Sequence, residues 1–200
     1  MLGRIALLLV PLVAAGGALG AGQSLDSAIL RPAQIGAGYA IAPGARSENL
    51  NEPTIDLCFR AFRSEVRRVE RLQVGYVRSG NEDTSNEVVR YRPGGAQLAL
   101  RELRAVSCDH VKRQARGGVD IGTMTVRRRT PKGAPPGSVT LSVETELISG
   151  GARTAITAVG VYQVRENLLS GVYAYGDESF PVARAVRLAR LSAANLKRAG

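Results

Sequence analysis

The sequence predicts an α+β fold, an antiparallel sheet of about six strands with two long helices packed on one face. Apolar and polar residues alternate strictly from Val139 to Leu147, which is typical of a half-buried strand. Connections of hairpin length between successive strand-like segments favour antiparallel neighbours. Two stretches carry apolar residues at helical spacing, near residues 96–106 and 182–196, and predict the helices that cover the sheet.

The first half of the chain begins irregularly and then becomes regular. Residues 22–53 predict a short helix from about Leu25, followed by an irregular lead-in with several glycines. Alternation then predicts a strand from about residue 69 to 78, a polar turn over 79–85 and a returning strand over 86–91. A Pro-Gly-Gly turn ends that strand and leads into the first amphipathic helix, which ends near Cys108.

The second half predicts a four-stranded meander after a basic loop. Its strands are expected over residues 119–127, 139–147, 154–164 and 168–175. The last helix is expected to begin near Pro181. Residues 54–200 are therefore expected to form a single α+β domain.

Residues 1–21 predict a secretory signal peptide. Arg4 precedes the apolar run from Ile5 to Val13, and small residues such as Ala18 and Gly20 surround the expected cleavage point. A permanent membrane anchor is the alternative, but the apolar run is far shorter than the roughly 20 residues of a spanning helix. We therefore expect a secreted, extracytoplasmic and soluble chain with no integral span after cleavage.

The composition restricts the chemistry of the protein. One histidine and two cysteines cannot supply a three-histidine zinc site, a zinc finger or an iron–sulfur cluster, so no metal and no cofactor is expected. The 27 basic residues exceed the 17 acidic ones and give a net charge of +10. Export and the scarcity of aromatic residues argue against nucleic acid as the partner. The charge instead favours an anionic envelope component or a small anionic ligand.

The cysteines Cys58 and Cys108 are interpreted according to the predicted compartment. An even count in an exported chain is most simply one disulfide, which would join the end of the first helix to the segment before the first strand. The alternative makes Cys108 a catalytic thiolate with His110 as its base.

Enzyme motifs are scarce. The sequence contains no Gly-x-Ser-x-Gly, His-Glu-x-x-His or Walker loop. We therefore expect no catalytic residues. The alternative function is a hydrolase that uses Asp56, Glu65 or the Cys108/His110 pair.

Arginines are the candidate ligand-binding residues. A basic cluster runs from Arg60 to Arg71, and Arg92 stands before a Gly-Gly pair where free backbone N–H groups of a helix start could meet an anion. The candidates for binding an anionic or amphiphilic ligand are Arg67, Arg71, Arg90 and Arg92.

Three segments carry a resemblance to a known family. They are Thr-Ile-Asp-Leu-Cys at residues 54–58, the run from Ser64 to Val74 and the run from Ser85 to Tyr91, together with the helix that ends in Cys108. The chain resembles secreted sensor-like domains of actinobacteria, broadly similar to the extracellular domain of PknH-type kinases. The resemblance implies a non-catalytic ligand-sensing module with a cleft beside an antiparallel sheet. Unlike the kinase-borne domains, this chain has no kinase or transmembrane helix and one possible disulfide instead of two.

These observations favour an exported, monomeric binding or sensor-like module of the cell envelope. Of the residues named above, the resemblance carries over only Cys58 and Cys108, as a structural bridge.

Overall fold

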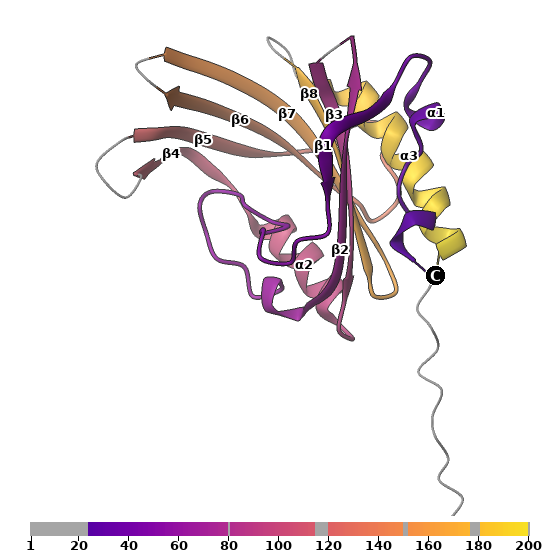
Figure 1. Cartoon of the computed structure of the whole chain (residues 1–200). Helices are drawn as coiled ribbons and strands as arrows, with labels where there is room; N and C mark the ends of the chain where they lie inside the picture. Colours follow the sequence, from indigo (N-terminus) through magenta and orange to yellow (C-terminus); the bar gives the residue numbers. More distant parts are fainter. Residues whose placement is uncertain (1–23, 80, 115–119, 150–151, 177–180, 200) are drawn as a thin grey trace, which may run out of the picture.

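One antiparallel sheet of eight strands organises the protein, in the order β1-β2-β3-β8-β7-β6-β5-β4 (Figure 1). The computed structural model describes residues 24–79, 81–114, 120–149, 152–176 and 181–199. The predicted α+β class and the antiparallel pairing are confirmed, but the sheet has eight strands where about six were expected. The predicted signal peptide, residues 1–21, lies outside the described residues.

Six of the strands correspond to predicted ones. They are β2 (Arg68–Arg78), β3 (Asn81–Tyr91), β5 (Asp120–Arg129), β6 (Val139–Ser149), β7 (Ala152–Arg165) and β8 (Leu168–Gly176). The predicted four-stranded meander is β5 to β8, and β8 pairs with β3 to join it to the first hairpin.

The two strands that the sequence did not predict are the edges of the sheet, β1 (Ala40–Ser47) and β4 (Cys108–Gln114). Each pairs on one side only, and each pairing is interrupted by a register shift. β1 contains Pro43, which has no N–H to donate and is tolerated at a sheet edge. Edge strands need no continuous apolar face, so the Pro-Gly interruption of β1 and the polar sequence of β4 resembled loops.

Strand β3 begins at Asn81, although the polar residues before Asn86 predicted a turn. Thr84, Ser85 and Asn86 are fully buried, and each has a polar partner. Asn86 accepts a hydrogen bond from the backbone N–H of Leu30 at 2.9 Å, and the Ser85 hydroxyl lies 3.0 Å from that of Tyr175. Partners distant in the chain therefore allow polar residues in a central strand.

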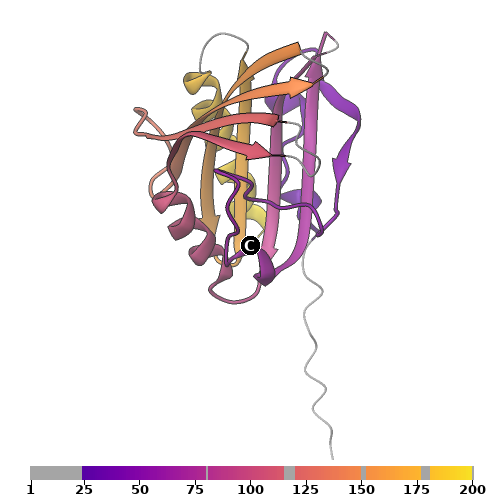
Figure 2. The ribbon, with the colours of Figure 1, turned by 90° about the vertical axis from the view of Figure 1, so that its left-hand side faces the viewer.

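Helices α2 (Gly95–Ala105) and α3 (Val182–Ala199) lie on opposite faces of the sheet (Figure 2), which corrects the prediction of two long helices on one face. Val89 packs in the same core cluster as α2, whereas its neighbour Val88 packs in the cluster that contains α3. Successive strand residues point to opposite faces, so the two clusters are the two sides of one sheet. Only α3 is long, with 18 residues against 11 in α2.

The lead-in contributes to the core beneath α3. The 3₁₀ helix η1 (Leu25–Ser27) stands where a short helix was expected. The one-turn helix α1 (Pro32–Ile35) and β1 follow, where an irregular course was expected. Leu25, Leu30 and Ile35 are at most 2% exposed and share a cluster with Leu188 and Leu196 of α3. This segment is visible in indigo beside α3 in Figure 1.

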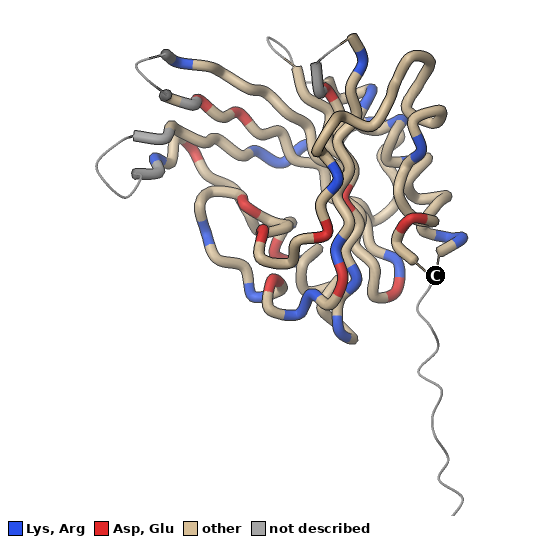
Figure 3. Tube along the Cα trace, in the orientation of Figure 1, with Lys and Arg blue, Asp and Glu red and all other residues tan. Residues whose placement is uncertain are grey.

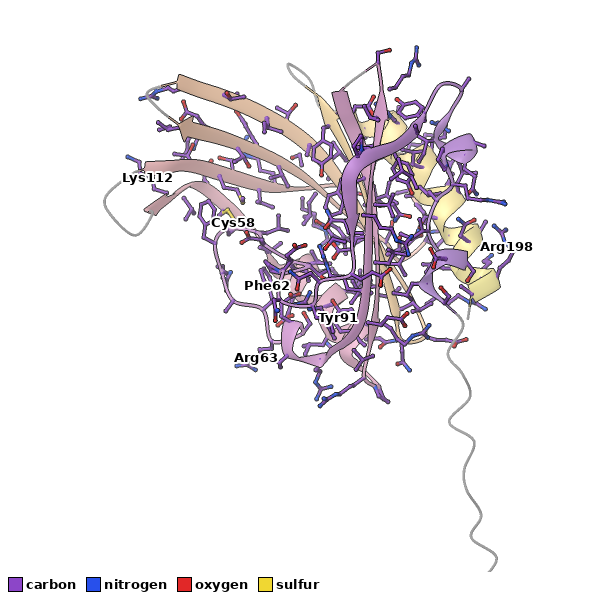
Figure 4. All side chains as sticks on the ribbon, viewed as in Figure 1. Cys58, Phe62, Arg63, Tyr91, Lys112 and Arg198 are labelled. Atoms are coloured by element: carbon purple, nitrogen blue, oxygen red, sulfur yellow. A yellow bond between two sulfur atoms is a disulfide. The ribbon has the colours of Figure 1, made fainter. Side chains whose placement is uncertain are left out.

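The predicted disulfide is present between Cys58 and Cys108, with Cα atoms 5.9 Å apart. It joins the first residue of β4 to the loop that precedes the second 3₁₀ helix, η2 (Glu65–Arg67). The bridge lies beside α2, where the Cys58 label marks it in Figure 4. Among the described residues, no helix combines the length and the apolar character that crossing a membrane requires.

Candidate functional site

The four arginines predicted to bind a ligand do not form one site. Arg71 on β2 is paired in register with Val89, and Arg90 is the next residue of β3. Cross-strand partners share a face and adjacent residues alternate, so Arg71 and Arg90 lie on opposite faces. Arg90 Nε donates to Glu70 at 2.9 Å.

Arg71 is enclosed in a polar network within the protein. Its side chain is 2% exposed, its Nε donates to Glu87 at 2.5 Å, and its Nη1 donates to Glu52 at 2.8 Å. The Thr54 hydroxyl donates to the same Glu87 oxygen at 3.0 Å. These contacts join the 47–54 loop to β2 and β3. Arg71 is thus a structural residue whose donors are directed at protein acceptors.

Glu87 is the acidic residue of this network whose pKa is raised to near neutral. Complete burial raises the pKa of Glu87 to about 7, because desolvation penalises the carboxylate more than Arg71 and Thr54 stabilise it. The nearby Glu65 carboxyl acts in the same direction by repulsion. The network therefore contains a carboxyl group that changes charge near neutral pH.

Two of the catalytic alternatives are engaged elsewhere in the structure, Cys108 in a disulfide and Glu65 with the backbone of a loop. Cys108 is oxidised in the disulfide, which contradicts the alternative of a Cys108 thiolate with His110 as its base. The His110 side chain is 74% exposed, and its Nδ1 lies 3.0 Å from Asp109. Glu65 accepts hydrogen bonds from the backbone N–H groups of Thr54 at 2.9 Å and Ile55 at 3.3 Å, so it fixes a loop.

Arg67 and Arg92, in contrast, are brought together at one end of the molecule. The backbone N–H of Arg92 donates to the carbonyl oxygen of Arg67 at 2.8 Å, which joins η2 to the turn before α2. Both side chains are exposed, as are those of Arg60 and Arg63 on the preceding loop. We call these four arginines, together with Val66, the basic end. Basic residues gather at this lower part of the molecule in Figure 3, and Arg63 points outward in Figure 4.

Val66 is the member of the basic end that sequence reasoning missed. It is 81% exposed, the largest exposure among the exposed large apolar residues of the described chain. Its position within a run of arginines was the available indication, but apolar residues in such a run equally fit a buried face. None of the described ion pairs includes Arg60, Arg63, Arg67 or Arg92.

A cavity of about 460 Å³ lies beside η2 and adjoins the basic end. Ile55 and Phe62 contribute apolar walls, and both belong to the core cluster that contains α2. Asp56 and Glu65 line it together with Arg60 and Arg68, so its charges balance. The cationic character belongs to the outer surface of this end and not to the cavity.

Comparisons with known proteins identify the fold. No protein-family model matches the chain, and no curated protein matches it. Among solved structures, it is similar to the extracellular domain of PknH from Mycobacterium tuberculosis, with a TM-score of 0.55 and 11% identity. The similarity covers 87% of this chain and 93% of that one, and it confirms the predicted distant likeness to that domain.

Proposed function

We propose that the protein is an exported, non-catalytic binding module of the cell envelope that attaches to anionic lipid surfaces through its basic end. The observation that carries this proposal is the combination of an 81% exposed valine with four exposed arginines outside the described ion pairs. A protruding apolar side chain surrounded by cations matches the boundary between acyl chains and anionic headgroups.

Two further observations support the compartment. Residues 1–21 have the composition of a secretory signal peptide. The Cys58–Cys108 disulfide is typical of proteins that work outside the reducing cytoplasm. Outside the cytoplasm, exposed arginines attract the anionic headgroups and polymers of the envelope.

The non-catalytic character is supported by the state of the candidate catalysts. Cys108 is oxidised, and Glu65 is occupied by two backbone N–H groups and by Arg68 at 3.2 Å. A thiol nucleophile needs a free thiol with a base held against it, and the disulfide leaves no free thiol at Cys108.

Cosedimentation with lipid vesicles tests the attachment. The mature chain, residues 22–200, is mixed with vesicles of phosphatidylcholine alone or in equal mixture with phosphatidylglycerol. We expect binding to the anionic vesicles only, falling steeply between about 50 mM and about 500 mM salt because exposed charges are screened. Equal binding to neutral vesicles, or binding that salt does not change, would contradict the proposal.

Matched variants locate the surface. Arg63→Glu combined with Arg67→Glu should weaken binding to anionic vesicles by more than about tenfold, since each basic residue near such a surface contributes roughly 1 kcal/mol. Val66→Ser should weaken it without changing the salt dependence. The control, Lys112→Glu with Arg128→Glu, makes the same change in net charge at exposed positions away from the basic end and should retain most binding. An equal loss of vesicle binding in the control variant would show that net charge, and not the basic end, determines the attachment.

A further inference from the structure

Strand β7 extends beyond its neighbour β6 at one end of the sheet. The last register pair between them is Val139 with Tyr162, whereas β7 continues to Arg165. Residues 163–165 pair with β8 only, and the loop over residues 130–138 takes the place of a strand beside them. Residues 163–165 therefore have no cross-strand neighbours on the β6 side, and the sheet is open there.

Two arginines hold that loop from opposite faces of the sheet. Arg104 of α2 donates from Nη2 to the carbonyl oxygen of Gly137 at 2.8 Å. Arg190 of α3 donates from Nε to the carbonyl oxygen of Gly133 at 2.6 Å. The loop is therefore fixed between the two helices. One space lies between the loop and α2, and the other lies between the loop and α3.

These two spaces are cavities that meet. One, of about 430 Å³, lies on the α2 side, and the other, of about 330 Å³, lies on the α3 side. Pro136 and Val164 line both, so the cavities adjoin. We call the pair the α2–α3 groove. Its apolar lining includes Leu100 of α2 and Leu196 of α3, which are 9% and 2% exposed.

The rim of the α2–α3 groove is cationic. Arg101 and Arg104 line the α2 side, and Arg165 and Lys197 line the α3 side. All four side chains are exposed, and none takes part in a described ion pair. No aspartate or glutamate is among the described residues that line either cavity. This arrangement differs from the charge-balanced cavity beside η2.

We propose that the α2–α3 groove binds a single-chain anionic amphiphile, with the acyl chain along the apolar residues of the lining and the anionic head at the cationic rim. Ligand pockets of this size combine an apolar lining with a few charged groups that orient the ligand. A polyanion would meet the cations but leave the apolar lining without a partner, and a neutral lipid would leave the cations without one. The α2–α3 groove does not depend on the basic end, because the two surfaces share no residue.

A fluorescent fatty acid tests the proposal. Dansyl-labelled undecanoic acid is titrated into the mature chain below its micelle concentration, and the neutral methyl ester of the same probe serves as the ligand control. We expect saturable binding of the acid with an affinity about tenfold or more above that of the ester, since opposite charge orients and retains the head. Absence of saturable binding, or equal affinity for acid and ester, would overturn the proposal.

Three variants assign the binding to the α2–α3 groove. Arg101→Glu with Lys197→Glu should reduce affinity for the acid by roughly tenfold and leave the ester unaffected. Ala193→Phe, which adds bulk to the α3-side lining, should reduce affinity for both probes. The Arg63→Glu/Arg67→Glu variant should bind the acid normally. Circular dichroism and thermal unfolding must show all variants folded, and unchanged binding in the first two would overturn the assignment.

The outcome is separable from that of the vesicle experiment. Loss of vesicle binding in the Arg63→Glu/Arg67→Glu variant with normal probe binding supports both proposals. If the mature chain binds the probe normally but does not bind anionic vesicles, the proposed membrane attachment is wrong. The proposal for the α2–α3 groove then still stands.

Discussion

At the residue scale, the role of each arginine is decided by its neighbours. Arg71 and Arg67 belong to the same basic cluster in the sequence, four positions apart. Arg71 is buried with its donors directed at Glu87 and Glu52, whereas Arg67 is exposed beside the turn that carries Arg92. A charge run therefore contains both structural and surface residues, and only tertiary contacts separate them.

The Glu87 carboxyl should titrate near neutral pH. Its pKa is raised from 4.5 to about 7 by complete burial, so the folded state holds this proton more tightly than the unfolded state. The contribution of this group to the free energy of unfolding is therefore full below about pH 4.5, and it is lost as the pH rises toward about 7. Carboxyl-carbon NMR of the side chain should show the raised midpoint.

The variant Glu87→Gln provides the thermodynamic control. Glutamine stays neutral, so the wild-type protein should lose stability relative to the variant when chemical unfolding is compared at about pH 4.5 and about pH 7. A carboxyl midpoint at or below 4.5, or a stability difference that does not change with pH, would contradict the raised pKa.

At the element scale, the central strands follow their pattern and the edges do not. β6 and β7 pair over eleven consecutive register positions, from Val139 with Tyr162 to Ser149 with Ala152. β1 and β4 pair on one side with shifted register, and their sequences carry no sustained apolar alternation. A central strand can therefore be predicted from its apolar alternation, whereas an edge strand often lacks that pattern.

On the face of the sheet that α2 covers, glycine and tyrosine are matched across strands. Tyr162 is in register with Gly171, and Gly160 is in register with Tyr173. The two rings meet edge to face with centroids 5.6 Å apart. A Cβ on Gly160 or Gly171 would lie 3.0 Å from a tyrosine ring or hydroxyl, so the absent side chains make room for the rings.

The lead-in should behave as part of the folded core. Leu30 is 1% exposed, so Leu30→Ala should lower the free energy of unfolding by about 2–5 kcal/mol through lost burial and the remaining cavity. Chemical denaturation measures the change. Leu50→Ala, at a position that is 40% exposed, is the control and should cost much less. Equal costs would show that residues 24–35 do not contribute to the cooperative core.

The disulfide should stabilise the α2 side of the sheet. Its residues are 50 positions apart, and closing a loop of that length in the unfolded chain contributes about 4 kcal/mol in the chain-entropy model. The double variant Cys58→Ser/Cys108→Ser should show a loss of this order in urea unfolding, and reduced wild-type protein should match it. A loss below about 1 kcal/mol would mean that contacts within the 53–64 segment hold it without the bridge.

At the scale of the whole molecule, charge is distributed unevenly. The net charge of +10 includes arginines used internally, such as Arg71, and arginines that fix segments, such as Arg184, which pairs with Asp83 and lies over the ring of Tyr39. The basic end and the rim of the α2–α3 groove are surfaces where exposed cations lie outside the described ion pairs. Net charge alone could not distinguish these surfaces from the internal uses.

The similarity to the PknH extracellular domain belongs to this scale as well. The chains share 11% identity but align over most of their lengths, so layout and topology persist where individual residues differ. The resemblance identified from residues 54–108 was therefore useful for the fold and the disulfide. It carried no information on the basic end or the α2–α3 groove.

The sequence by itself determined the α+β class, the central strands, both amphipathic helices and the cysteine pair. These features depend on local periodicity and on residue counts, which the chain displays directly. Only the tertiary structure decided that α2 and α3 lie on opposite faces, that β1 and β4 form the edges, and that Arg71 is buried while Arg67 is exposed. These outcomes depend on which distant segments meet. Periodicity along a chain shows that a face is apolar, but it does not show what covers that face.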